Sequence, residues 1–305
     1  MTVIFDRIAF IGIGHIGSSL ARVIRRDRLA NHIVASARTG ATLEKALALG
    51  LADSITPDPA EAADGADLVI LCTPVGAYGG IAAAIAPRLK PGAVVSDVGS
   101  VKLAVVNAVQ PHLPSGVHFV PTHPVAGTEN SGPESGFETL FEGRWVILTP
   151  PAGTDEAAIA KVEALWRATG CLIERMDAAH HDKVLAITSH VPHLIAYTIV
   201  GTATDLEEHT KAEVIKFSAS GFRDFTRIAA SDPVMWRDIF LNNREAVLEM
   251  VGRLWEDLAL LQRAIRTGDA ATLEAHFARG REIRRGVVEA RQHIPPAPDG
   301  GENKK

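Results

Sequence analysis

One histidine lies where it could act as a base. His123 belongs to residues 122–129 (THPVAGTE), which we expect to be a loop, stiffened by proline and glycine, directly after a strand. The oxidation of an alcohol needs a base beside the hydroxyl group, and histidine exchanges protons near neutral pH. An isolated loop histidine is usually only a surface residue, but Pro124 restrains this one. We therefore predict that His123 is a catalytic base.

A glycine-rich turn supplies a second chemical feature. A GxGxxG pattern lies between an apolar run, residues 7–12, and a predicted helix, residues 18–26. In this context the first glycine allows a tight turn, the second admits a pyrophosphate, and the third lets the helix pack closely on the strand. The pyrophosphate then binds at the positive end of the helix dipole. We predict a dinucleotide site formed by Gly12, Ile13, Gly14, His15, Ile16 and Gly17.

The choice between NAD⁺ and NADP⁺ depends on the end of the second predicted strand, residues 32–36. An Asp or Glu there usually binds the 2′-hydroxyl of the NAD ribose. This sequence continues as Ala37-Arg38-Thr39, without a carboxylate. Arg38 could bind the 2′-phosphate of NADP⁺, or stack on adenine and accept either cofactor. We predict cofactor contacts from Arg38 and Thr39, with NADP⁺ slightly favoured over NAD⁺.

Polar residues also follow two later strands, at residues 68–72 and 93–97. Open α/β sheets bind their ligands at this carboxyl edge. The second of these strands runs into residues 96–102 (SDVGSVK), a strand end that leads into a helix. We predict further cofactor contacts from Thr73, Pro74, Val75, Asp97 and Gly99.

Two segments in the second half combine histidines and charges. His190 and His193 lie in a predicted helix, and residues 221–227 (GFRDFTR) contain Asp224 and Arg227. On a helix, Asp224 could orient the Arg227 guanidinium toward a substrate carboxylate, although a surface ion pair is the alternative.

The histidines of this half also suggest a zinc site. No cysteine or clear carboxylate ligand accompanies His180, His181, His190 and His193 at the spacing of a metal motif. Hydride transfer to a nicotinamide needs no metal. We therefore expect no metal, and hydrogen-bonding roles near the substrate instead.

Short apolar runs in the first half are expected to be strands: residues 7–12, 32–36, 68–72, 93–97, 118–120 and 145–148. Helical patterns alternate with them, which is typical of βαβ units and a parallel sheet covered on both faces. From Asp177 onward only helical periodicity is found. We predict an α/β fold with three regions: a Rossmann-type, doubly wound, mostly parallel sheet domain (residues 1–177), an all-helical substrate and dimerisation domain (178–293) and a disordered tail (294–305).

A long helix is predicted from Asp232-Pro233, a cap and a first helical position, to near Gly268. Apolar residues follow one another along it at spacings of 4-3-4-3-4: Val247, Val251, Leu254, Leu258, Leu261 and Ile265. This heptad seam must pack against another helix. The partner helix belongs either to the same chain or to a second subunit.

The composition excludes several classes of protein. The chain has 305 residues, 47% hydrophobic and 22% charged, with a net charge of −5, which fits a globular protein of about two domains and no nucleic-acid partner. Two cysteines cannot form a disulfide framework, so we predict a reducing, cytoplasmic compartment. The N-terminus lacks the basic region of a signal peptide. Residues 68–87 are uncharged over 20 positions, but Pro74 and three glycines divide them, so we expect a βα unit and no membrane span.

The order of these motifs resembles that of the prephenate/arogenate dehydrogenases, also called cyclohexadienyl dehydrogenases. The resemblance covers about residues 6–290, and its most specific motifs are HHDKVLAITSHVPH and GFRDFTRIAASDPVMWRDI, after DVGSVK and HPVAGTENSG. It implies a Rossmann domain and a homodimer formed through intertwined C-terminal helices. It also implies oxidative decarboxylation of a cyclohexadienyl acid with NAD⁺ or NADP⁺, in tyrosine biosynthesis.

The resemblance also implies residue roles. His123 would bind the ring 4-hydroxyl and accept its proton, with Ser100 helping to hold that hydroxyl and the histidine near the nicotinamide. Arg227 would pair with a substrate carboxylate, with Asp224 beside it, and Glu129 would gate the pocket. The other matched positions line or support the substrate side: His190, His193, Trp236 and, as an acidic partner, Asp182. This sequence departs from NAD-using members at Ala37, where they have an acidic residue.

Two other functions are alternatives. A β-hydroxyacid-type dehydrogenase would use a catalytic lysine such as Lys183, but it would leave His123 and residues 221–227 without a purpose. A nicotinamide-sensing protein would bind the cofactor without turnover. No fused chorismate mutase domain is expected, and too little sequence follows Ile265 for a regulatory ACT domain. No residue distinguishes prephenate from arogenate.

Overall fold

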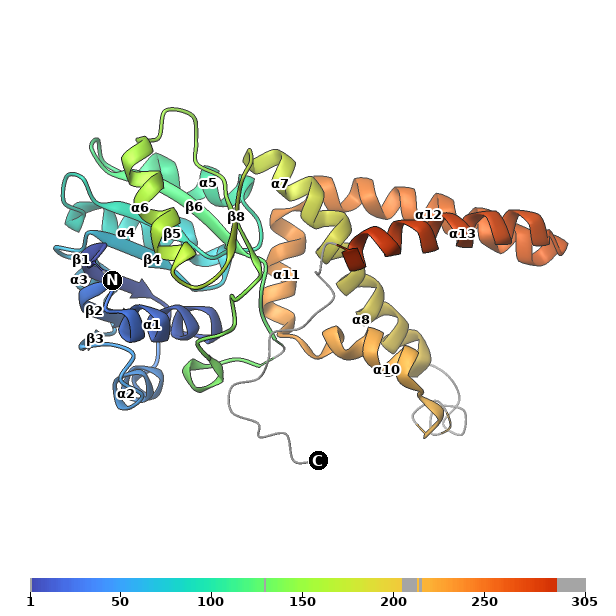
Figure 1. Cartoon of the computed structure of the whole chain (residues 1–305), viewed down its shortest axis with the longest axis horizontal. Coiled ribbons are helices and arrows are strands. Elements are labelled where there is room, and N and C mark those ends of the chain that lie inside the picture. The colour runs from blue at the N-terminus through green and yellow to red at the C-terminus, as the bar shows by residue number, and fades with distance from the viewer. Residues whose placement is uncertain (1, 129, 205–212, 214–215, 290–305) are drawn as a thin grey trace.

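The computed structural model describes residues 2–128, 130–204, 213 and 216–289. Within these residues a single sheet of eight strands is covered by helices, and a helical region extends away from it as two arms (Figure 1). The strands are β1 (Phe5–Ile11), β2 (Ala30–Ser36), β3 (Ser54–Thr56), β4 (Leu68–Leu71), β5 (Val94–Asp97), β6 (His118–Pro124), β7 (Trp145–Leu148) and β8 (Leu172–Arg175).

Helices α1 to α6 belong to the sheet domain: α1 (His15–Asp27), α2 (Gly40–Ala48), α3 (Pro59–Ala63), α4 (Tyr78–Ile85), α5 (Leu103–Val109) and α6 (Glu156–Arg167). Short 3₁₀ turns join them: η1 (Val75–Ala77), η2 (Ala86–Arg88), η3 (Gln110–His112) and η4 (Pro133–Ser135). The helical region contains α7 (Ala178–Leu185), the π-helical turn η5 (Ala186–His190), α8 (Val191–Thr204), α10 (Ser220–Thr226), the 3₁₀ turn η6 (Arg227–Ala230), α11 (Pro233–Asn242), α12 (Arg244–Thr267) and α13 (Ala270–Glu289).

The sheet has the order β3-β2-β1-β4-β5-β6-β7-β8. Neighbouring strands are parallel except β6 and β7, which are antiparallel. The predicted mostly parallel, doubly wound sheet is therefore confirmed, and the strand order reverses between β1 and β4, where such folds bind ligands. The prediction missed β3 and β8, because β3 has only three residues and β8 is largely exposed.

Both faces of the sheet are buried. Along β1, Ile8 and Phe10 join the core that contains α1 and α6, whereas Ala9 and Ile11 join the core that contains α4 and α5. This alternation follows from the two-residue period of a strand. Trp236 of α11 is buried in the second core, so the helical region is anchored in the sheet domain.

Two predicted elements differ from the structure. His123 lies within β6, paired with Ile147 of β7, and not in the loop after the strand. The long helix predicted from Pro233 to Gly268 is two helices, because Asn243 leaves the helical conformation (φ −116°, ψ 36°). The buried Asn243 side chain donates to the carbonyl oxygen of Asp182, which fixes the break. Helix α12 does end at Gly268, in the left-handed conformation (φ +68°).

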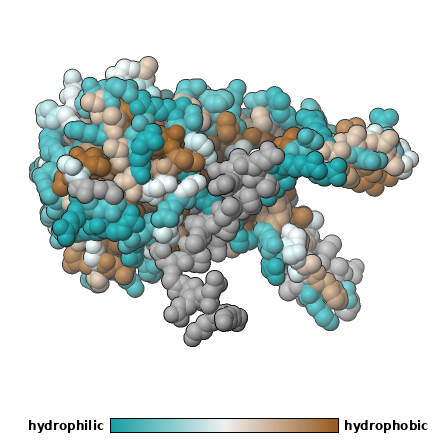
Figure 2. Space-filling model, in the orientation of Figure 1, coloured by the Kyte–Doolittle hydropathy of each residue, from teal (hydrophilic) through white to brown (hydrophobic). Residues whose placement is uncertain are grey.

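The seam of α12 is buried at only one end. Val247 is buried beside Ala186, whereas Leu258 is 50% and Ile265 68% exposed. Figure 2 shows hydrophobic residues along the arm formed by α12 and α13, and Trp255 on this arm is 73% exposed. Within the described residues, Ala178–Ala203 is the one helical stretch long and apolar enough to cross a membrane. The predicted tail, residues 294–305, lies outside the described residues.

Candidate active site

In the glycine loop after β1, two glycines are required by close packing, and the third has free space around it. Gly12 has φ +91°, and a Cβ there would lie 2.8 Å from the carbonyl carbon and oxygen of Cys72. A Cβ at Gly17 would lie 3.2 Å from the Gly12 carbonyl oxygen, so α1 packs directly against the loop. In contrast, a Cβ at Gly14 would meet no protein atom within 4 Å. The open position is the one where a pyrophosphate approaches the backbone in this motif.

The start of α1 also fits an anionic group. Gly14 is its N-cap and supplies no side-chain cap, and the first turn contains no acidic residue. The unpaired N–H groups and the positive end of the helix dipole thus remain for a phosphate. These features fit the pyrophosphate of a dinucleotide, which would be held by Gly14 and the first turn of α1. The Ile13 side chain, in contrast, is buried in the core.

The segment after β6 packs over this loop. His15 Nδ1 lies 3.0 Å from both the carbonyl oxygen and the Oγ of Ser135, and the His15 ring is 5.9 Å from that of Phe137. Ser19 Oγ accepts the Phe137 N–H at 3.1 Å. The side chain of His15 therefore ties the cofactor loop to the segment that follows the predicted base.

The remaining predicted cofactor residues lie at the same edge of the sheet. Arg38 and Thr39 are exposed directly after β2, and Thr39 caps α2. Thr73, Pro74 and Val75 follow β4, next to Gly12. A Cβ at Gly99 would lie 2.7 Å from Val75 Cγ1, so this glycine permits close contact between the loops after β4 and β5.

Asp97, another predicted cofactor residue, is bound by donors of the protein itself. Its carboxylate is fully buried and accepts hydrogen bonds from Lys102 Nζ, Gly99 N (2.7 Å) and Thr122 N (3.2 Å). Lys102 Nζ also donates to the Thr122 carbonyl oxygen at 2.8 Å. Burial raises the pKa of Asp97 and lowers the pKa of Lys102, against the attraction within the pair. Asp97 therefore joins the end of β5 to Lys102 and to β6, and its contact with a cofactor stays a prediction.

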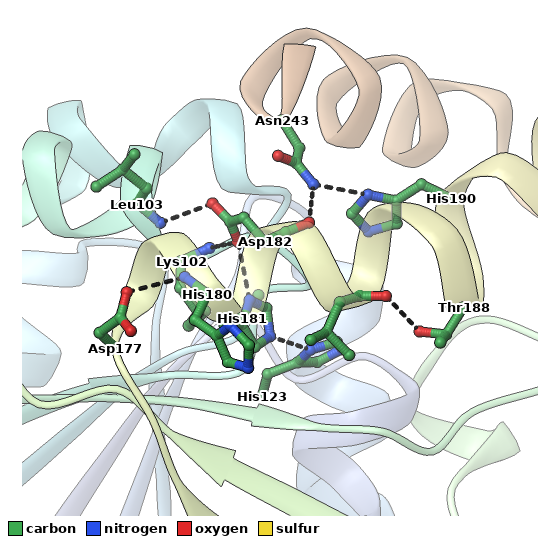
Figure 3. A network of polar contacts seen from close by, with 12 residues as sticks. Lys102, Leu103, His123, Asp177, His180, His181, Asp182, Thr188, His190 and Asn243 are labelled. Carbon is green, nitrogen blue, oxygen red and sulfur yellow. Dashed lines mark hydrogen bonds and ion pairs between the residues drawn. The ribbon is translucent and has the colours of Figure 1, made fainter. Parts of the chain in front are cut away.

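His123 lies at the end of β6 and begins a chain of hydrogen bonds (Figure 3). Its Nδ1 is 2.8 Å from His181 Nε2, and His181 Nδ1 is 2.8 Å from Asp182 Oδ1. Asp182 Oδ1 also accepts the Lys102 N–H at 2.7 Å, and Oδ2 accepts the Leu103 N–H at 2.9 Å. The structure thus links a strand of the sheet domain to α7 of the helical region.

The surroundings of His123 keep its ring neutral. His123 is 6% exposed, and burial lowers its pKa well below 6.5. The positive charges that His181, Lys102 and His190 can carry lower this pKa further. A neutral imidazole with one nitrogen engaged by His181 can accept a proton on the other nitrogen.

Asp182, predicted as an acidic partner on the substrate side, is buried and bound by protein donors. Its carboxylate caps the N-terminus of α5 with both oxygens and accepts from His181. Both oxygens are thereby occupied by protein donors. Asp182 therefore positions α7 against α5, and its role on the substrate side stays a prediction.

Three rings, those of His190, His193 and Trp236, pack together beside this chain of hydrogen bonds. His193 stacks on Trp236, with ring centroids 3.7 Å apart and an interplanar angle of 23°, and His190 meets Trp236 edge-on at 6.0 Å. His190 Nδ1 lies 3.1 Å from Asn243 Nδ2, and burial lowers the pKa of His190 to about 4. His193 Nδ1 donates to the Ser189 carbonyl oxygen at 2.9 Å, so its Nε2 is an acceptor.

The predicted carboxylate-binding group acts on these rings through its charge. A positive charge on Arg227 lowers the pKa of His193. Arg227 begins η6, after the end of α10, and Asp224 accepts a hydrogen bond from Arg223 Nε at 3.2 Å. Orientation of Arg227 by Asp224 therefore stays a prediction. Ser100 is half-buried between β5 and α5, and Glu129 lies outside the described residues.

The histidine cluster does not have the geometry of a metal site. Among the described residues, no three His, Cys, Asp or Glu side chains are placed to hold an ion. The nitrogens of His123 and His181 face each other at 2.8 Å, a hydrogen-bond distance. Two imidazoles that bind zinc at about 2.0–2.1 Å each need a wider separation at tetrahedral angles.

Sequence reasoning missed three residues of this site: His181, Lys102 and Asn243. For His181 the sequence predicts only an unspecified hydrogen-bonding role, although the adjacent carboxylate of Asp182 was a signal for a hydrogen-bonded pair. The buried Lys102 is part of the DVGSVK motif but was given no role. Asn243 gave no signal, because it lies inside a continuous helical pattern.

The comparison with family models matches both halves of the chain. The nucleotide-binding domain of prephenate dehydrogenase matches residues 20–175, and the dimerization domain of prephenate dehydrogenase matches residues 177–279. The cyclohexadienyl dehydrogenase of Zymomonas mobilis is 43% identical over 284 residues, which cover 93% of this chain and 96% of that protein.

Two solved structures are also similar. The prephenate dehydrogenase of Aquifex aeolicus, in complex with hydroxyphenyl propionate and NAD⁺, has a TM-score of 0.83 and 33% identity, over 93% of this chain and 98% of that one. The arogenate dehydrogenase of Synechocystis has a TM-score of 0.77 and 26% identity, over 92% of this chain and 99% of that one. With a dinucleotide-binding loop, a buried histidine at the same sheet edge and both family domains matched, this chain belongs to the prephenate dehydrogenase family of NAD(P)-dependent oxidoreductases.

Proposed function

We propose that this protein catalyses the oxidative decarboxylation of prephenate or arogenate, in tyrosine biosynthesis, with His123 as the base. The observation that carries the proposal is the state of His123. This ring is buried, burial lowers its pKa well below 6.5, and its Nδ1 is hydrogen-bonded to His181, so that Nε2 is the nitrogen free of this contact and can meet a substrate hydroxyl. The similarity to dehydrogenases that are named for prephenate, arogenate and cyclohexadienyl substrates supports this choice of substrates.

Substrate binding is assigned to the charged and aromatic residues of the helical region. Arg227 pairs with a substrate carboxylate, because its guanidinium presents a planar set of donors to two oxygens. Asp224, His190, His193 and Trp236 line or support this side, and Glu129 gates it. Ser100 helps to hold the ring hydroxyl beside His123.

The protein forms no covalent bond to the substrate in this reaction, and its main task is to orient the substrate ring. The cofactor supplies a hydride acceptor for C4 of the substrate ring. His123 Nε2 takes the proton of the C4 hydroxyl, and the oxygen becomes a ketone. The resulting vinylogous β-keto acid loses its ring carboxylate as CO₂, and the released electron pair makes the ring aromatic. His123 then returns the proton to the phenolate oxygen. The protein contributes by holding the ring in place and excluding water from the buried base.

NADP⁺ is proposed as the slightly preferred cofactor. Arg38 is exposed at the end of β2, where the ribose 2′ position is bound in this fold, and Ala37 offers no carboxylate to a 2′-hydroxyl. The loop residues around Gly14 are proposed to hold the pyrophosphate.

The proposed assembly is a cytoplasmic homodimer that forms through the C-terminal helices, without a membrane or nucleic-acid partner. The exposed apolar side chains of α12 and α13, among them Leu258 and Trp255, support such a contact. The apolar stretch Ala178–Ala203 contains buried polar residues of the site, including His181 and His190, which favours packing within the protein over a membrane span. We further propose domain limits of residues 1–177 and 178–293.

Absorbance of the reduced cofactor tests the proposal. Purified protein is given prephenate or arogenate, each with NAD⁺ or NADP⁺. Turnover is expected in at least one of the four combinations, and the pattern of kcat/KM assigns both substrate and cofactor. A folded protein that binds cofactor but is inactive in all four combinations would overturn the proposal.

A further inference from the structure

We infer that His181 is a positioning residue for the reaction, because it fixes His123 in the tautomer that leaves Nε2 as the acceptor and links that ring to the carboxylate of Asp182. This inference rests on the proposed function, since it concerns the base that the proposed reaction uses. It assigns a role to a histidine that contacts the base and the Asp182 carboxylate.

The direction of the hydrogen bonds follows from the carboxylate. Asp182 accepts the backbone N–H groups of Lys102 and Leu103, and an ionised carboxylate can only accept. His181 Nδ1 must therefore carry a proton and donate it to Asp182 Oδ1 at 2.8 Å. In a neutral His181 the other nitrogen, Nε2, is then an acceptor. It faces His123 Nδ1 at 2.8 Å, so His123 must donate from Nδ1 and keep its lone pair on Nε2.

The packing leaves the two rings little freedom to change this arrangement. His181 is fully buried, and the two rings meet nearly edge to face, with centroids 5.0 Å apart and an interplanar angle of 69°. Figure 3 shows both rings between the end of strand β6 and helix α7, joined by dashed lines to Asp182. A third group that orients a catalytic base in this way is a recurrent device in enzymes.

The same chain of hydrogen bonds stabilises the positive charge that His123 acquires during the reaction. When Nε2 takes a proton, the imidazolium still donates from Nδ1 to His181, whose far side is bonded to the negative Asp182. The other ionisable groups around His123 are Lys102, from the segment before α5, and His190, from η5, and a positive charge on either opposes the imidazolium. Lys102 is itself paired with the buried Asp97 of β5. Among these groups, Asp182 is the carboxylate that reaches the base through a hydrogen-bonded partner.

The link crosses from one domain to the other. His123 belongs to β6 of the sheet domain, whereas His181 and Asp182 belong to α7 of the helical region. Because Asp182 caps α5, the docking of α7 on α5 and the orientation of the base depend on the same carboxylate. The base is therefore correctly oriented only when the two domains are docked.

Three variants test the role of His181 in the full-length protein. His181→Phe keeps a ring of similar size but removes the acceptor for His123. His181→Gln keeps an amide oxygen that can accept from His123 Nδ1. His180→Phe is the matched control, because His180 is the adjacent residue of α7 and its side chain is exposed. A melting curve for each variant identifies any that does not fold.

Steady-state kinetics and nitrogen NMR are the two readouts. We expect His181→Phe to lower kcat by about 10²-fold with KM within about 3-fold, because an orienting group acts on the base and not on substrate binding. His181→Gln should restore kcat to within about 10-fold of the wild type, and His180→Phe should match the wild type. In ¹⁵N spectra of histidine-labelled protein without substrate, wild-type His123 should be protonated on Nδ1. In His181→Phe it should shift toward the Nε2-protonated tautomer.

Two results would overturn the inference: a wild-type His123 protonated on Nε2, or a folded His181→Phe variant with wild-type kcat. The tautomer is measured without turnover, so it stands apart from the proposed function. Failure of the wild type on both substrates would remove the proposed reaction and leave the tautomer result intact. Wild-type activity with an unaffected His181→Phe variant would remove only the role of His181.

Discussion

The carboxylate of Asp182 lies 2.7 Å from the backbone nitrogen of Lys102, although the two residues are 80 positions apart in the sequence. The contact caps α5 of the sheet domain with a side chain from α7 of the helical region. Both oxygens of Asp182 are used, since Oδ2 accepts the Leu103 N–H. One buried carboxylate thus holds together the helix that follows the DVGSVK motif and the helix that carries His181.

This contact predicts a measurable loss of stability in Asp182→Asn. The amide can accept with only one atom, so a buried N–H group loses its partner, at a cost of about 1–3 kcal/mol in the free energy of unfolding. Thermal unfolding at fixed protein concentration measures the change. Asp155→Asn is the control, because Asp155 caps the exposed start of α6 with one oxygen and Asn caps nearly as well as Asp. Equal melting temperatures for Asp182→Asn and the control would contradict the structural role.

The glycine loop predicts opposite effects for two similar substitutions. Gly12→Ala should destabilise the protein, because its Cβ would lie 2.8 Å from the Cys72 backbone and its φ is +91°. Gly14→Ala should leave the melting temperature unchanged, since no protein atom lies within 4 Å of its Cβ. It should instead weaken cofactor binding at least about 10-fold, because the methyl group occupies the approach of the pyrophosphate. Fluorescence titration with NADPH and NADH measures this binding, and unchanged affinity in Gly14→Ala would place the pyrophosphate elsewhere.

The preference for NADP⁺ can be tested at Arg38. Arg38→Ala should raise the Kd of NADP⁺ about 10-fold or more and leave the Kd of NAD⁺ within about 2-fold, because only NADP⁺ carries the 2′-phosphate. Calorimetric titration with both cofactors measures the two values. A similar loss for both would indicate stacking on adenine, and no loss for either would remove Arg38 from the site.

The buried histidines predict how stability depends on pH. Burial lowers the pKa of His190 to about 4 and that of His123 well below 6.5. Between these values and 6.5 the unfolded chain binds protons that the folded chain does not, so stability rises with pH in this window. The contribution is complete above about pH 6.5 and is lost as the pH falls toward 4.

Melting temperatures between pH 4.5 and 8 measure this dependence. His190→Gln should flatten the curve below pH 6.5, whereas His112→Gln, at an exposed histidine, should follow the wild type. A wild-type melting temperature that is constant across this range would contradict the buried neutral state of these rings.

Much of the fold could be predicted from the sequence, because its signals are local. The apolar runs that form β1, β4 and β5 and the GxGxxG turn each lie within a dozen residues. The break at Asn243 could not be predicted, because it depends on a hydrogen bond to the carbonyl oxygen of Asp182, far away in the sequence. The helical period continues across this position, so the local pattern predicted one helix.

In the candidate site, too, the features with local signals could be predicted and those that depend on distant contacts could not. His123 could be chosen from its motif and neighbours, but its place inside β6 depends on pairing with Ile147. His181 acquires its role only when α7 docks on the sheet domain. Asp97 and Asp182 are predicted beside ligands, and in the structure both carboxylates also accept hydrogen bonds from backbone N–H groups. These backbone donors are brought to the two carboxylates by the fold, so the sequence alone could not predict the hydrogen bonds.

His123 acts as the base while Arg227 binds the substrate, and steady-state kinetics of two variants separate these two roles. His123→Asn should lower kcat by about 10²–10⁴-fold with little change in KM, because a base acts in the transition state. Arg227→Ala should mainly raise KM, because the carboxylate is bound in both the ground and the transition state. Equal effects on kcat and KM in both variants, or a His123→Asn variant with wild-type kcat, would contradict these roles.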